Sequence, residues 1–78
     1  MSIEALFSNP QYIEDEIIRM REAWGSRKTF TKETIDASRK TLAFMHLYAP
    51  ESMLDIVDAN LYELERRESL MLFKGLTI

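Results

Sequence analysis

Apolar residues between Pro50 and Lys74 recur at the spacing of an α-helix and predict the longest helix of the chain. At about 100° per residue, one side of this helix collects Met53, Leu54, Val57, Leu61, Leu64, Met71 and Leu72. The opposite side collects Glu51, Asp55, Asp58, Tyr62 and Glu65. Pro50 suits the first turn of a helix, and Gly75 is well placed to end it in a left-handed cap. We therefore predict an amphipathic helix over residues 50–74.

A second helical pattern precedes it, with two possible starts. Ser8 with Gln11 forms a capping box, and Asn9 followed by Pro10 at the first helical position is an equally good start. Apolar residues then continue at helical spacing as far as a glycine, which stops the pattern. We predict a helix over residues 9–24 that begins at one of these two caps.

A polar and basic loop, residues 25–29, separates this helix from the next one. Thr31 is the expected N-cap of the following helix, because its hydroxyl can accept from a free backbone N–H. Pro50 disfavours helical geometry at Ala49, the residue before it. The predicted helix therefore covers residues 31–49 and meets the next helix in a tight corner.

These patterns predict an all-α fold, a small antiparallel bundle of three main helices with room for a short helical turn before them. The 78 residues are enough for one domain, 1–78, and 46% apolar with 29% charged residues argue against disorder. The chain has no cysteine, which excludes disulfides and thiolate zinc sites. It shows neither a signal-peptide pattern nor an apolar run of about 18 residues, so we expect a soluble, cytoplasmic protein without membrane contact.

The net charge of −3 is unevenly distributed along the chain. Residues 1–18 carry four acidic side chains and no basic one, whereas residues 19–40 carry seven basic side chains against three acidic ones. Residues 41–78 are acidic again. Such asymmetry can create a local binding field on a molecule that is anionic as a whole.

The residue inventory argues against an enzyme. Nucleophilic catalysis needs a hydroxyl or thiol beside a base, and the only histidine, His46, falls at the boundary between polar and apolar helix faces. No Glu-x-x-His pair or glycine-rich phosphate loop occurs. Asp55 and Asp58 belong to an acidic stripe that is better explained as a solvated helix face than as a metal site. We expect no catalytic, cofactor or metal site.

The basic segment 19–40 supports nucleic-acid binding as the alternative function. A helix, a glycine turn and a second helix loosely match a helix-turn-helix arrangement, and Trp24 could add stacking beside the loop. The possible nucleic-acid or anion contacts are Arg27, Lys28, Lys32, Arg39 and Lys40. Glu33 and Asp36 weaken this prediction, because they dilute the positive charge of the helix that would enter the groove.

Surplus apolar residues favour a protein partner. Leu70 and Phe73 lie away from the main apolar stripe of their helix, so one small bundle cannot readily bury the whole segment from Leu70 onwards. The predicted interface consists of Trp24, Leu70, Met71, Phe73 and Leu76. In the competing interpretation, an N-terminal arm over residues 3–7 covers this segment within one monomer.

Glu68 falls inside the apolar arc of the third helix and needs a cation if it is buried there. Arg19, Arg21 or a second copy of the chain could supply it, and a helix that loosens at this point would leave Glu68 in water. The sequence predicts a non-enzymatic interaction module, an accessory, adaptor or inhibitor protein that binds a larger protein and forms a homodimer.

Overall fold

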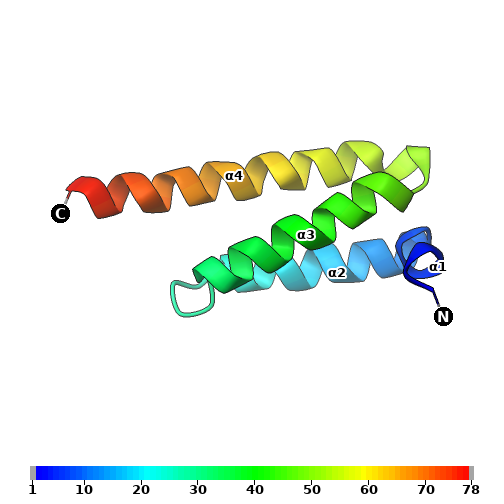
Figure 1. The fold of residues 1–78 in the computed structure, drawn as a ribbon, viewed down its shortest axis with the longest axis horizontal. Coiled ribbons are helices and arrows are strands. Elements are labelled where there is room, and N and C mark those ends of the chain that lie inside the picture. Colours follow the sequence, from blue (N-terminus) through cyan, green and yellow to red (C-terminus); the bar gives the residue numbers. More distant parts are fainter. Residues whose placement is uncertain (1, 78) are drawn as a thin grey trace.

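The computed structural model describes the backbone of residues 2–77 and the side chains of residues 2–72. Five helical elements follow one another within these residues (Figure 1): α1 (Ile3–Phe7), α2 (Pro10–Trp24), α3 (Lys32–Tyr48), the 3-10 turn η1 (Glu51–Met53) and α4 (Leu54–Thr77). The prediction of an all-α fold is confirmed, and so is that of a short helical element before the three main helices.

Asn9, not Ser8, caps α2. Its side-chain oxygen accepts from the backbone N–H of Gln11 at 3.0 Å, and Pro10 occupies the first helical position. Proline fits there because the missing N–H would have no partner inside the helix. Phe7 packs edge-on against Tyr12, with 5.5 Å between the ring centres, and so fixes the angle at which α1 meets α2.

The predicted ends of α3 are confirmed. The hydroxyl of Thr31 accepts from the backbone N–H of Thr34 at 3.2 Å, and α3 ends at Tyr48. Ala49 is extended, with ψ at 148°, as expected for a residue that precedes proline. Pro50 then leads into η1, which turns the chain into α4.

Both predicted ends of the third helix were wrong. Pro50 is followed by the 3-10 turn, so α4 begins at Leu54 instead of residue 50. At the other end, α4 continues through Gly75 to Thr77, and no glycine in residues 2–77 has a positive φ. A glycine weakens a helix by about 1 kcal/mol relative to alanine but does not by itself end one.

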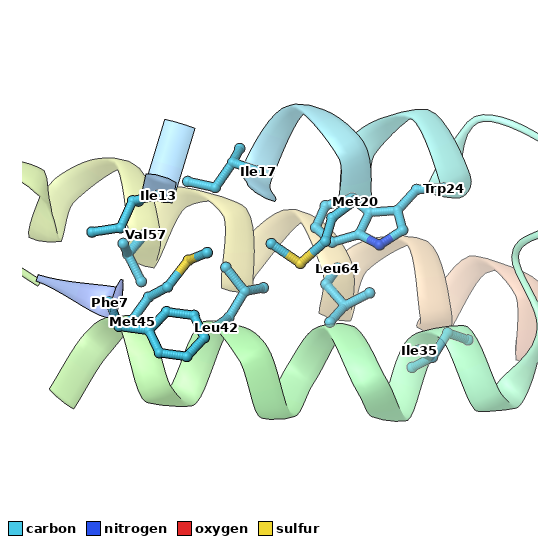
Figure 2. Close-up of a cluster of buried hydrophobic side chains, with 10 residues drawn as sticks. All are labelled: Phe7, Ile13, Ile17, Met20, Trp24, Ile35, Leu42, Met45, Val57 and Leu64. Atoms are coloured by element: carbon cyan, nitrogen blue, oxygen red, sulfur yellow. The ribbon is translucent and has the colours of Figure 1, made fainter. Parts of the chain in front are cut away.

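The core is a single apolar cluster between α2, α3 and α4, closed at one end by α1 (Figure 2). Its fully or nearly buried members are Phe7, Ile13, Ile17, Met20, Trp24, Ile35, Leu42, Met45, Val57 and Leu64. On each main helix they recur at intervals of three, four or seven residues, which is the spacing of one helical face. The buried face of each helix therefore follows the periodic pattern in the sequence.

The main helices run in alternating directions along the long axis of the molecule (Figure 1). α1 lies at the end where α3 finishes, and α4 extends past the α2–α3 connection at the opposite end. Its 24 residues correspond to about 36 Å of helix, most of the 45 Å length of the molecule. No helix within residues 2–77 combines the length and the apolar character needed to cross a bilayer.

Candidate functional site

Trp24 belongs to the core in this structure. Its side chain is 4% exposed, and the indole Nε1–H donates to the hydroxyl of Ser38 at 3.0 Å. Ser38 is buried as well, so this hydrogen bond joins α2 to α3 inside the core. A side chain held in this way is not free to meet a partner, so Trp24 does not belong to an exposed surface.

Two polar contacts join α2 to α4. Arg21 donates to the side-chain oxygen of Asn60 at 2.8 Å, and Arg67 donates to the backbone carbonyl of Trp24 at 3.1 Å. The second contact satisfies a carbonyl at the end of α2, where an arginine also interacts favourably with the helix dipole. Asn60 is buried on the apolar line between Val57 and Leu64, and its amide donates to the carbonyl of Ile56.

Glu63 holds the arginines of this region in place. Its carboxylate accepts from Arg66 at 2.8 and 3.1 Å and from Arg67 at 2.8 Å. These hydrogen bonds with Arg66 and Arg67 lower the pKa of Glu63 from 4.5 to about 2. The hydrogen bond to Glu63 in turn raises the pKa of Arg66. Because Arg67 also reaches α2, the Glu63 carboxylate helps to fix α4 against its neighbour.

An ion pair and a histidine–carboxylate contact join α3 to α4. Arg39 pairs with Glu68, whose side chain is 29% exposed, and His46 Nδ1 lies 2.9 Å from Asp58 Oδ1 on the exposed edge. Glu68 is thus partly buried and paired, but its partner is Arg39 instead of the expected Arg19 or Arg21. Arg39, a predicted nucleic-acid contact, is therefore engaged within the molecule.

The other predicted basic contacts are exposed. Arg27 and Lys28 lie in the α2–α3 connection, and Lys32 and Lys40 lie on α3. Asp36 also lies on α3 and approaches Arg39 at 3.5 Å, which places a carboxylate among these cations. The structure therefore distributes the basic side chains over a loop and a helix and mixes them with acidic ones.

The last turns of α4 expose apolar side chains. Leu70, Met71 and Leu72 are 47%, 38% and 59% exposed, and together with Ser69 they form the described part of what we call the α4 projection, residues 69–77. Among the described side chains of α4, Arg67 and Glu68 are the last ones bonded to another helix. The predicted interface residues Phe73 and Leu76 lie outside the residues whose side chains the structure describes.

The N-terminal arm does not cover this segment. α1 packs on α2 and α3 at the opposite end of the molecule (Figure 1). There Phe7 stacks on Phe44 with 5.8 Å between the ring centres. The competing interpretation, in which residues 3–7 bury the α4 projection within one monomer, is therefore wrong. The apolar side chains of residues 70–72 are left to solvent within one copy of the chain.

The outer face of α4, which points away from the core, carries a shallow open depression. It is lined by Tyr62, Glu65, Arg66, Ser69 and Leu70. Tyr62 is 70% exposed, although its ring is the largest side chain of the set. The depression contains one acidic, one basic, one small and two large apolar or aromatic side chains, so it offers a contact surface and no enclosed cavity.

Asn60 is a buried polar residue that the sequence analysis did not identify. Asn60 lies three residues after Val57 and four before Leu64, so its helical phase marks it as a buried polar group of the core line. Within the described residues, no group of three or more histidine, cysteine or carboxylate side chains is close enough together to hold a metal ion.

Comparisons with known proteins add no assignment. No family model matches the chain, and the searches of curated proteins and of solved structures return no match.

Proposed function

We propose that this chain is a non-enzymatic protein-interaction module, an accessory, adaptor or inhibitor protein that binds a larger protein and forms a homodimer. The observation that supports the proposal is the exposure of Leu70, Met71 and Leu72 on the α4 projection. Three consecutive apolar residues occupy about 200° of the helix circumference, so no single packing surface within the bundle can cover them.

The arrangement of these side chains favours a contact surface over a misplaced core. Met71 follows Leu64 by seven residues and lies on the same line of α4 that is buried further back. Leu70 and Leu72 flank that line on either side. A contiguous exposed apolar patch on a small protein is typical of an interaction site, and methionine adapts well to different partners.

Leu72→Asp tests the proposal, because it places a charge in the patch without touching the core. Leu47→Asp is the matched control: Leu47 is 69% exposed, but it lies on the last turn of α3 at the other end of the molecule. Both variants should keep the helical circular dichroism spectrum of the wild type.

The readouts are light scattering of the purified protein and affinity capture from lysate with and without nuclease. We expect Leu72→Asp to lose both self-association and the captured protein, while Leu47→Asp retains them. Wild-type behaviour of Leu72→Asp in both assays would remove the basis of the proposal.

The nucleic-acid alternative is supported only by the exposed cations Arg27, Lys28, Lys32 and Lys40. It predicts binding that weakens steeply with salt, because each neutralised phosphate releases counterions. Charge reversal at Arg27 and Lys28 would abolish such binding. Nuclease-sensitive capture that also responds to this double variant would shift the assignment to the α2–α3 connection.

A further inference from the structure

We infer that the outer face of the C-terminal half of α4 packs on the same face of a second copy, antiparallel and centred on Ser69. This inference rests on the proposed function and names its homodimeric contact. The face is the one lined by Tyr62, Glu65, Arg66, Ser69 and Leu70. None of its side chains bonds to α1, α2 or α3 in the described part of the chain.

Ser69 is suited to the centre of such a pair because it is small and exposed. At about 100° per residue it lies within about 20° of Tyr62 and close to the middle of the outer face. A small residue at a crossing point lets two helices approach closely. The same surface patch then serves both copies, as a two-fold contact requires.

The edges of the face are compatible with this register. In an antiparallel pair with a two-fold axis, each edge of one helix meets the same edge of the other. With Ser69 at the axis, Glu65 lies beside Leu72 of the second copy, and Arg66 lies beside its Leu70. The long stem of Arg66 can cover an apolar neighbour while its charged group stays in water, and among residues 62–72 of the two copies no like charges face each other.

Charge disfavours the competing registers. If the axis passed between Glu65 and Arg66, Glu65 would face Glu65 of the second copy, and Arg66 would face Arg66 of the second copy. A parallel pair would bring Asp55 of one copy close to Asp55 of the other and Asp58 close to Asp58, because both residues lie within about 40° of Tyr62 around α4. Like charges directly opposite each other are destabilising. Centring on Ser69 instead places the two Asp58 residues about 33 Å apart along the helices.

The size of the contact sets its strength. With Ser69 at the axis, position 62 of one copy lies opposite position 76 of the other. The two helices therefore overlap over about 15 residues, or about 22 Å of helix about 10 Å wide. Such a strip lies below the usual 1,200–2,000 Å² of a stable protein interface. We therefore expect a weak dimer that dissociates on dilution through the micromolar range.

The absence of cysteine from the chain allows a direct test by disulfide trapping. Helix axes 8–10 Å apart with Cα atoms about 2.3 Å from each axis leave about 3.4–5.4 Å between facing Cα atoms, which overlaps the disulfide range. We expect Ser69→Cys to form a covalent dimer under mild oxidation. Asp58→Cys should stay monomeric, and Ala43→Cys, exposed on α3, measures random collision.

Cross-linking of Asp58→Cys as fast as Ser69→Cys would indicate a parallel pair and overturn the inference. Cross-linking of Ser69→Cys no faster than Ala43→Cys would overturn it as well. The binding of a larger protein is tested separately: a wild type that stays monomeric at high concentration yet captures a protein through Leu72 refutes the homodimer and its contact but not the interaction module. A monomer that captures nothing refutes both.

Discussion

The hydrogen bond between Trp24 and Ser38 can be measured with a double-mutant cycle. Ser38→Ala leaves the indole N–H buried without a hydrogen-bond partner. Trp24→Phe likewise leaves the buried Ser38 hydroxyl without its indole partner. The double variant removes both polar groups together. Because an unsatisfied buried polar group is costly whereas a matched apolar pair is not, the two single changes should not add.

The magnitudes follow from burial. Leaving the indole N–H unsatisfied should cost about 1–3 kcal/mol in the free energy of unfolding, and Trp24→Phe should cost more because it also leaves a cavity. We expect the double variant to be more stable than the sum predicts by about 1 kcal/mol. A 78-residue domain has about 4–12 kcal/mol of stability, so each single variant should remain folded.

Urea unfolding followed by far-ultraviolet circular dichroism is the suitable assay, since the only tryptophan is lost in two of the variants. With a slope of about 1–2 kcal/mol per M, a cost of about 1–3 kcal/mol means that Ser38→Ala should lower the unfolding midpoint by about 0.5–3 M. Two outcomes would refute the reasoning. Additivity within about 0.3 kcal/mol would mean that the bond contributes nothing, and unchanged midpoints would mean that Trp24 is not buried.

Two further predictions concern acid and burial. Arg66 and Arg67 hold the pKa of Glu63 near 2, below its ordinary 4.5, so the stability from its charged form is complete above about pH 4.5 and is lost towards pH 2. Glu63→Gln should therefore weaken the dependence of the urea unfolding midpoint on pH between about pH 4.5 and pH 2. A pH dependence equal to that of the wild type would contradict the hydrogen bonds of Glu63 with Arg66 and Arg67. Leu42→Ala, at a fully buried site, should cost about 2–5 kcal/mol, whereas Leu47→Ala should stay within about 0.5; equal melting temperatures would contradict the assigned burial.

The starts of the helices could be predicted because the chemistry is local. Asn9 and Thr31 each bond a backbone N–H within three residues, so the sequence alone contains both partners. The end of α2 is also recognisable from the glycine that follows Trp24. By contrast, nothing within a few residues of Gly75 requires a left-handed cap, and α4 continues through it.

Contacts between helices could not be assigned from the sequence. Glu68 needed a cation, but several arginines were available, and only the packing of α3 on α4 selects Arg39, 29 positions away. Trp24 fits equally well on an apolar core stripe and beside a basic loop. The hydrogen bond to Ser38 shows that Trp24 belongs to the core. This contact is known only once α2 and α3 are placed relative to each other.

Only the apolar part of the candidate surface, and not its outer face, can be predicted from the sequence. The surplus of apolar residues near Leu70 and Met71 is visible in the sequence, because a small bundle has room for only one buried stripe per helix. The outer face around Tyr62 and Ser69 is not visible in this way. Tyr62 lies on the polar side of the pattern, and its exposure becomes informative only beside the apolar side chain of Leu70.

The central position of α3 has a consequence for how the chain folds. α1, α2 and α4 all pack on α3, and the two largest contacts join helices that are neighbours in the sequence or separated by one turn. Helical proteins with such short-range contacts fold in microseconds to milliseconds, because little chain entropy is lost in closing the loops. The α2–α3 and α3–α4 hairpins share one helix, so whichever forms first presents the surface on which the remaining helix docks.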